Sequence, residues 1–263
     1  MRFQANGNEA YAYTGGKAFD AKLPTVIFVH GAQHDHSVWI LQSRYLAHHG
    51  YGVLALDLPG HGRSAGPALA GIGDLAEWVA AVQDAVGVKQ AAIVGHSMGS
   101  LIALECAARH PDRVAKIALL AIAYPMKVSA ELLDATRNDE PLAQDMVNIW
   151  SHSAYAQYPN CPGPGFWVIG ENLRLMQRQK PGVMHADFAA CNAYAGGERA
   201  AAGVRCPALL LLARRDLMTP LRAARDFAKS IPGAQTVVIE GSGHNMMAEK
   251  PDAVLDTLAG FLK

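Results

Sequence analysis

Two patterns of hydrophobic and polar positions alternate along most of this chain. Six short runs are continuously apolar and rich in Val, Ile and Leu, which is typical of strands buried on both faces of a sheet. Stretches with apolar residues three and four positions apart, typical of amphipathic helices, lie among them. The apolar runs are at 25–31, 51–60, 90–97, 114–123, 207–216 and 235–244, and the helical stretches are at 72–87, 98–109, 221–230 and 251–262. Strands that alternate with helices predict an α/β fold with a mostly parallel sheet and helices on both faces.

The N-terminus has a different pattern. Two short runs within residues 2–14 flank the pair Asn6-Gly7, and Asn-Gly between such runs is a strong signal for a hairpin. We expect these two strands to be antiparallel and to lie at one edge of the sheet.

Residues 124–204 break the alternation, because they contain no convincing buried strand. Amphipathic pieces occur at 129–137, 141–151 and 181–195. The segment 158–167 is rich in proline and glycine and predicts a loop. An insertion of this length is far longer than an ordinary connection. We therefore predict a helical cap at 124–204, on a core domain formed by residues 1–123 and 205–263.

Composition predicts a folded protein that acts on a small molecule. Of the 263 residues, 51% are hydrophobic and 17% are charged, which allows a sizeable core and differs from a disordered chain. The 23 basic and 23 acidic residues give a formal net charge of zero, so nothing suggests a nucleic-acid or an anionic-membrane partner. We expect a small neutral or amphipathic substrate, and a monomer or a homodimer.

Cysteine usage and the N-terminus predict a cytoplasmic location. The four cysteines are scattered, with no pair at CxxC spacing, which is typical of reduced thiols. Residues 1–20 are polar and show no apolar leader, and the longest apolar runs are well short of a membrane span.

Ser97 stands between a predicted strand and a predicted helix, in the segment GHSMG. A serine in so tight a turn must take a strained backbone conformation with a positive φ angle. Side chains two residues away on either side would collide, which explains glycine at 95 and 99. The turn would lift the hydroxyl clear of the sheet beside free N–H groups of the helix. We interpret Ser97 as a nucleophile rather than a helix-capping serine.

A serine nucleophile needs a histidine base, and the base needs an orienting acid. Asp216 ends one apolar run, and His244 follows the last run through two glycines. With Ser97, both would lie at the edge of the sheet where ligand sites of open α/β sheets occur. Asp216 could alternatively cap a helix and His244 could be an ordinary loop residue, but the three positions together favour a catalytic triad.

An acyl-transfer site also needs two N–H donors for the developing oxyanion. We assign them to Met98, at the helix start, and Ala32, in the loop after the first buried strand. The same loop holds His34 and His36, but this spacing without a distant ligand is a weak metal signal. Residues 57–66 loosely match a dinucleotide fingerprint, yet Gly66-Pro67 leaves no helix to receive a pyrophosphate. We therefore expect no metal and no organic cofactor.

Five motifs in order resemble the α/β-hydrolase fold superfamily. They are His30-Gly31 with Trp39, DLPGHGRS at 57–64, GHSMG at 95–99, PALLLLARRDLMTP at 207–220 and GSGHNMMAEKP at 241–251. The resemblance runs from about residue 24 to the C-terminus and is weakest across the cap. It implies an eight-stranded sheet with the cap inserted between strands six and seven. It also implies a Ser97–His244–Asp216 triad with oxyanion donors at Ala32 and Met98, as in a serine-nucleophile, esterase-like member.

Some positions narrow the activity within this superfamily. Relatives that are dehalogenases or epoxide hydrolases carry an aspartate at the position of Ser97, and plant-type hydroxynitrile lyases carry a lysine at that of Asn245. The alternative acid position, after the sixth strand, holds no carboxylate, which favours Asp216. Arg214 and Arg215 stand where relatives often carry a glycine, a departure that leaves Asp216 in place.

These observations predict a hydrolase of carboxylic esters with small-to-medium apolar groups, which acts through an acyl-enzyme. Met218, Met246, Trp150 and Trp167 are expected to line the substrate pocket, with ordinary packing as the alternative. Three other functions stay open. They are hydrolysis of a carbon–carbon bond in a β-diketone or ring-cleavage product, cofactor-free perhydrolysis, and ligand binding as a low-turnover receptor.

Overall fold

The computed structural model describes residues 1–157 and 167–263. The loop predicted at 158–167 lies outside the described residues, except for Trp167. No helix within the described ranges has both the length and the hydrophobicity needed to cross a membrane.

Eight strands form a single sheet in the order β1-β2-β4-β3-β5-β6-β7-β8. They are β1 (Arg2–Ala5), β2 (Asn8–Tyr13), β3 (Thr25–Val29), β4 (Gly52–Asp57), β5 (Ala91–His96), β6 (Val114–Leu120), β7 (Ala208–Ala213) and β8 (Gln235–Ile239). The pairs β1–β2 and β2–β4 are antiparallel, and all the others are parallel. The prediction of a mostly parallel, eight-stranded sheet with an antiparallel hairpin at one edge is confirmed.

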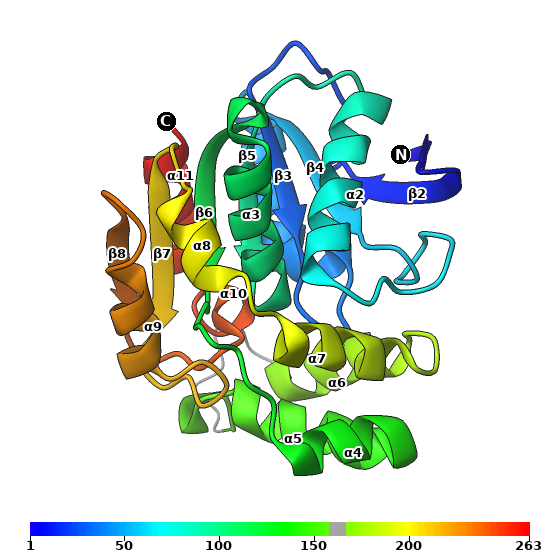
Figure 1. Cartoon of the computed structure of the whole chain (residues 1–263), viewed down its shortest axis with the longest axis vertical. Helices are drawn as coiled ribbons and strands as arrows, with labels where there is room; N and C mark the ends of the chain where they lie inside the picture. Colours follow the sequence, from blue (N-terminus) through cyan, green and yellow to red (C-terminus); the bar gives the residue numbers. More distant parts are fainter. Residues whose placement is uncertain (158–166) are drawn as a thin grey trace.

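Helices cover both faces of this sheet (Figure 1). The core helices are α1 (Ile40–His48), α2 (Ile72–Ala85), α3 (Met98–Arg109), α9 (Leu221–Ala228), α10 (Met246–Glu249) and α11 (Pro251–Leu262). Strand β3 shows why its whole sequence is apolar. Ile27 and Val29 belong to the hydrophobic cluster that includes α2 and α3, whereas Val26 and Phe28 belong to the cluster that includes α1 and α11. Alternate residues of one strand therefore fill two cores.

The chain between β6 and β7 forms helices and no strand within its described residues. These helices are α4 (Ala130–Asn138), α5 (Glu140–Ser151), α6 (Val168–Gln177), α7 (Val183–Ala193) and α8 (Gly197–Ala202). Helices α4 to α7 lie beyond the carboxyl ends of the parallel strands, at the bottom of Figure 1. Residues of α4, α5, α6 and α7 share a third hydrophobic cluster of their own.

Helix α8 differs from its neighbours, because it packs against α3. Its Ala200 and Ala201 belong to the cluster beneath α2 and α3 rather than to the third cluster. By packing, therefore, α8 groups with the core, although it lies within the predicted cap. Gly197, at its start, lies so close to Tyr124 that a Cβ atom there would collide with the tyrosine ring. The chain thus leaves the core and returns to it at nearly the same place.

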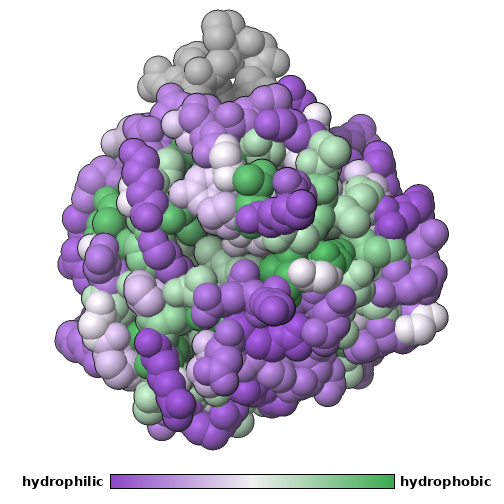
Figure 2. Space-filling view, turned by 90° about the horizontal axis from the view of Figure 1, so that it is seen from above, coloured by the Kyte–Doolittle hydropathy of each residue, from purple (hydrophilic) through white to green (hydrophobic). Residues whose placement is uncertain are grey.

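The opposite end of the molecule, at the top of Figure 1, has both hydrophilic and hydrophobic residues on its surface. Figure 2 shows hydrophilic residues over much of this face, with hydrophobic residues in patches between them. The cavity that carries the candidate chemistry lies at the other end, among the carboxyl ends of the strands and the helices of the insertion.

Candidate active site

Ser97 occupies a sharp turn between β5, which ends at His96, and α3, which begins at Met98. Its φ of 54° and ψ of −118° lie in a region that non-glycine residues rarely adopt and that costs roughly 1–3 kcal/mol. The flanking glycines allow this turn. A Cβ atom on Gly95 would collide with the carbonyl oxygen of Gly99, and one on Gly99 would collide with that of Val29. The sequence GHSMG therefore brings α3 into direct contact with β3.

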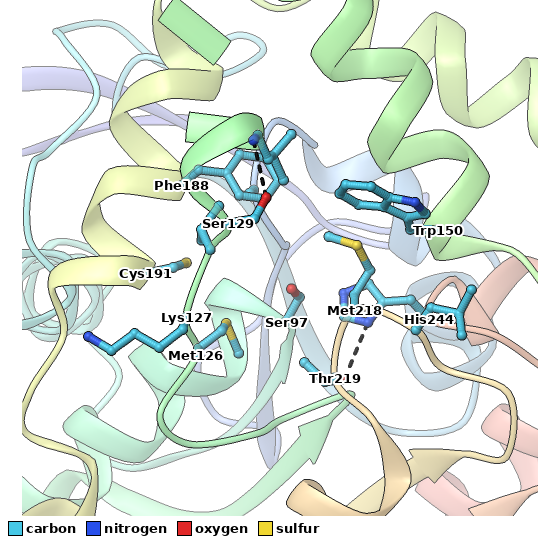
Figure 3. A pocket seen from close by; sticks show the side chains of 14 residues that line it. Ser97, Met126, Lys127, Ser129, Trp150, Phe188, Cys191, Met218, Thr219 and His244 are labelled. Atoms are coloured by element: carbon cyan, nitrogen blue, oxygen red, sulfur yellow. Dashed lines mark hydrogen bonds between the residues drawn. The ribbon is translucent and has the colours of Figure 1, made fainter. Parts of the chain in front are cut away.

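The hydroxyl of Ser97 is left free by this turn. The backbone N–H of Ser97 donates to the Leu120 carbonyl at 2.9 Å, and its carbonyl oxygen accepts from the Ser100 hydroxyl at 2.5 Å. Its own hydroxyl has no hydrogen-bond partner among the described residues, and it faces a cavity that His244 also lines. Figure 3 shows both side chains directed toward that cavity.

His244 and Asp216 form a buried pair behind Ser97. The loop after β7 carries Asp216 and the loop after β8 carries His244, and each residue is 5% exposed. His244 Nδ1 lies 2.8 Å from Asp216 Oδ2. Because a carboxylate only accepts, Nδ1 carries the proton, and Nε2 is left as the basic atom.

Asp216 is held in place by its own turn. Its Oδ1 accepts the backbone N–H groups of Met218 at 2.8 Å and Thr219 at 2.7 Å, and its Oδ2 accepts the Thr219 hydroxyl at 2.7 Å. Burial opposes ionisation of the carboxyl group, but the His244 ring and the Thr219 donors outweigh it, so the pKa of Asp216 lies below its ordinary value. The acid is therefore ionised at neutral pH.

His96 supports the histidine loop from beneath. Its Nε2 lies 2.9 Å from the carbonyl oxygen of His244, and the two ring centroids are 4.8 Å apart. Burial, with the nearby His244, lowers the pKa of His96 well below its ordinary value, so the ring is neutral and donates from Nε2.

Ala32, in the loop after β3, lines the same cavity. His30 Nδ1 lies 2.8 Å from the Gly31 carbonyl oxygen, and His30 Nε2 accepts the Leu58 N–H at 3.1 Å. The Gly31–Ala32 peptide is trans, so the Ala32 N–H points away from the carbonyl that His30 holds. Neither this N–H nor that of Met98 donates to any described residue.

The cavity has a volume of about 370 Å³ and lies between the strand ends and the helices of the insertion. Trp150 and Met218 line it, as Figure 3 shows. Met246 and Trp167 do not, and the expectation for these two residues is corrected. Met246 is fully buried in the core cluster with α1 and α11, and Trp167 is 68% exposed at the start of α6.

Several lining residues were missed by sequence reasoning. The insertion supplies Met126, Val128, Leu132, Phe188 and Cys191. Local sequence carries no signal for these residues, because their approach to Ser97 depends on how α4 and α7 pack. Thr219 was also missed, although its position three residues after Asp216 is typical of a hydroxyl that hydrogen-bonds the carboxylate of a preceding turn.

Asp35, His36 and Asp57 bring their ligand-type atoms within 4.8 Å of one another. Each carboxylate already has protein donors, however. Asp35 accepts from the Arg178 guanidinium at 2.8 Å and 2.6 Å, and Asp57 Oδ1 accepts from the His36 backbone and faces its ring at 2.7 Å. This donor set fits a hydrogen-bonded cluster that fixes two loops better than it fits a cation.

Comparison with known proteins agrees with this geometry. A family model described as alpha/beta hydrolase fold matches residues 24–251. The chain belongs to the α/β-hydrolase family. Pimeloyl-[acyl-carrier protein] methyl ester esterase of Chromobacterium violaceum is 33% identical to this hydrolase over 220 residues, which are 80% of this chain and 83% of the esterase.

Two further similarities concern the fold and a longer protein. The crystal structure of the enol-lactonase from Burkholderia xenovorans LB400 superposes with a TM-score of 0.87 at 24% identity, over 99% of each chain. The dihydrolipoyllysine-residue acetyltransferase component of the acetoin cleaving system of Pseudomonas putida is 29% identical over 248 residues. That match covers 90% of this chain but only 63% of the acetyltransferase component.

Proposed function

We propose that this α/β hydrolase cleaves carboxylic esters of small-to-medium apolar substrates through an acyl-enzyme on Ser97. The observation that carries the proposal is the buried Asp216–His244 pair, 2.8 Å apart, whose histidine lines the same cavity as the strained Ser97 turn. Similarity to a methyl ester esterase over four fifths of the chain supports ester chemistry.

In this mechanism His244 Nε2 takes the proton of the Ser97 hydroxyl while the serine oxygen attacks the ester carbonyl carbon. The carbonyl π electrons move to oxygen, and the N–H groups of Ala32 and Met98 stabilise the resulting oxyanion. His244 then protonates the leaving alcohol as its C–O bond breaks, which leaves an acyl-enzyme. Water attacks this ester in the same way and releases the acid. Asp216 keeps the histidine proton on Nδ1 and stabilises the imidazolium throughout.

The lining of the cavity supports an apolar substrate group without a charge. Lys127 is the one Lys, Arg, Asp or Glu among the described lining residues. Its ammonium points away from Ser97 in Figure 3 and donates to the Asn192 carbonyl at 3.1 Å. The remaining wall is made by side chains such as Leu132, Trp150 and Phe188. A substrate carboxylate placed against them would lose its hydration without gaining hydrogen bonds, which is unfavourable.

The test is hydrolysis of p-nitrophenyl esters from acetate to dodecanoate by wild type and by Ser97→Ala. Loss of the nucleophile should lower kcat by at least about 10³-fold. Ser43→Ala is a matched control, because Ser43 is fully buried and its hydroxyl donates to the Ile40 carbonyl on α1, remote from the cavity.

Each result decides between functions. Activity in wild type and Ser43→Ala but not in Ser97→Ala supports the proposal, and the preferred acyl length measures the pocket. Equal activity in all three proteins would rule out Ser97 as the nucleophile. An inert wild type would reject ester hydrolysis. Three assays would then separate the other functions: turnover of a β-diketone for carbon–carbon hydrolysis, peroxide-dependent halide oxidation for perhydrolysis, and ligand-induced thermal shifts for a receptor.

A further inference from the structure

Asp187, on helix α7, reaches from the insertion into the core and contacts two loops at once. The side chain is 1% exposed. Its Oδ2 accepts the backbone N–H of Gln33 at 2.7 Å and lies 2.8 Å from Nε2 of His61, which is also 1% exposed. Gln33 directly follows Ala32 in the loop after β3, and His61 lies in the loop after β4. The mechanism described above assigns no role to Asp187 or His61.

Gln33 sits in a turn that needs outside support. The His34 N–H donates to the Gly31 carbonyl at 3.3 Å, and Gln33 has a φ of 54°. This left-handed conformation costs a non-glycine residue about 1–2 kcal/mol. Rotation of the Ala32–Gln33 peptide would relieve this unfavourable φ angle. It would also break the hydrogen bond from the Gln33 N–H to the buried carboxylate of Asp187. Hydrogen bonds to charged groups are worth about 1.5–3 kcal/mol, which is enough to hold the turn.

The two peptide planes on either side of the Ala32 Cα are therefore held separately. His30 holds the Gly31–Ala32 plane through the Gly31 carbonyl, as described above, and Asp187 holds the Ala32–Gln33 plane through the Gln33 N–H. The Ala32 N–H lies in the first of these planes, and Asp187 acts on it through the Ala32 Cα, which the two planes share.

His61 is the buried side chain that faces the carboxylate of Asp187. His61 Nδ1 lies 3.0 Å from the Pro59 carbonyl oxygen, and Nε2 faces Asp187. Since both partners only accept, both ring nitrogens must carry protons, and His61 is an imidazolium. Burial opposes this charge, but the adjacent Asp187 outweighs it and raises the pKa of His61. A buried carboxylate thus has a buried cation beside it.

We propose that Asp187, paired with His61, is a positioning residue for the oxyanion hole, which aims the Ala32 N–H at the developing oxyanion. The proposal rests on the proposed function. Helix α7 also supplies Phe188 and Cys191 to the cavity wall. Helix α7 would therefore contact the substrate and also help to fix the direction of the Ala32 N–H. If α7 were displaced, the enzyme would bind ester but turn it over slowly.

The test compares Asp187→Ala, which removes the acceptor for the Gln33 N–H, with Glu140→Gln. Glu140 is a matched control, because it lies on α5 of the same insertion and contacts the same residue, but through the Gln33 side chain at 2.7 Å instead of its backbone. Loss of a whole oxyanion donor costs about 10²–10³-fold in kcat, so a misdirected donor should cost about 10- to 100-fold. KM should change less than threefold in Asp187→Ala, and Glu140→Gln should stay within threefold of wild type in both constants.

Two further measurements separate positioning from general damage. An alkyl trifluoromethyl ketone forms a tetrahedral oxyanion adduct with a serine nucleophile, and its inhibition constant should rise by the same factor as kcat/KM falls. The pKa of the His61 ring, followed by NMR titration, should be lower in Asp187→Ala than in wild type. If Asp187→Ala does not fold, the double variant His61→Leu, Asp187→Leu replaces the buried ion pair by two apolar side chains. It also removes the acceptor for the Gln33 N–H, so the same kinetic limits apply.

Each failure has its own signature. A folded Asp187→Ala protein that keeps kcat within threefold, or that loses activity only through KM, overturns the positioning role, as does an equal loss in Glu140→Gln. Failure of the proposed function is seen instead in wild type or in Ser97→Ala, before any substitution at 187, and it would overturn this inference as well.

Discussion

Replacing Asp216 with Asn tests how the acid places the proton on His244. Oδ1 of Asp216 accepts two backbone N–H groups, from Met218 and Thr219, and these donors require an oxygen. The amide oxygen of Asn will therefore take the Oδ1 position, and its NH₂ group will face His244 Nδ1. His244 must then carry its proton on Nε2, where it cannot accept the proton of Ser97.

We expect this wrong tautomer to lower kcat on the preferred p-nitrophenyl ester about 10⁴-fold, which corresponds to about 5.5 kcal/mol in the barrier. KM and the thermal unfolding midpoint should change little, since Asn has nearly the same shape as Asp. Thr219→Val is the control, because it removes one hydroxyl donor and leaves the acid, and it should cost about tenfold or less. An Asp216→Asn enzyme with more than 1% of the wild-type kcat at pH 7 would refute the reasoning.

Two other predictions concern stability and the pocket. Burial lowers the pKa of both His30 and His34 to about 4, whereas an unfolded chain keeps about 6.5, so the unfolded state binds more protons between these values. The free energy of unfolding should therefore fall as pH drops from 6.5 toward 4, by up to about 3 kcal/mol per histidine. His34→Gln should remove the part of this pH dependence that His34 contributes. Equal urea midpoints at pH 7 and pH 4.5 would contradict the prediction. Trp150→Ala opens the cavity wall, so it should raise kcat/KM for the p-nitrophenyl dodecanoate relative to the hexanoate about tenfold or more. An unchanged chain-length profile would show that the acyl group binds elsewhere.

The sheet and the positions of its motifs could be predicted from the sequence because both depend on local signals. Strand β3 is apolar throughout because it has two buried faces. Ser97 is flanked by glycines at 95 and 99 because a Cβ atom at either position would collide with backbone atoms. Asp216 and His244 could be placed because parallel strands bring their carboxyl ends to one edge. Their roles in catalysis stay predictions until the variants are measured.

The wall of the pocket could not be predicted in the same way. Met218 and Met246 each lie two residues after a predicted triad residue, yet one lines the cavity and the other packs beneath the sheet. Sequence distance from the triad says nothing about which way a side chain points. Phe188 reaches the cavity only through the packing of α7 on α4, and Asp187 reaches Gln33 across 154 positions of the chain.

The contact between Tyr124 and Gly197 has a consequence for how this protein could change. Residues 125–196 begin and end at one point on the core, and α8 already forms the crossover from β6 to β7 without them. A segment attached in this way can be lengthened, shortened or exchanged for another without altering strand order or register. New substrate ranges could thus arise by transplanting one continuous stretch of chain, provided that the replacement again offers a carboxylate to the backbone of Gln33.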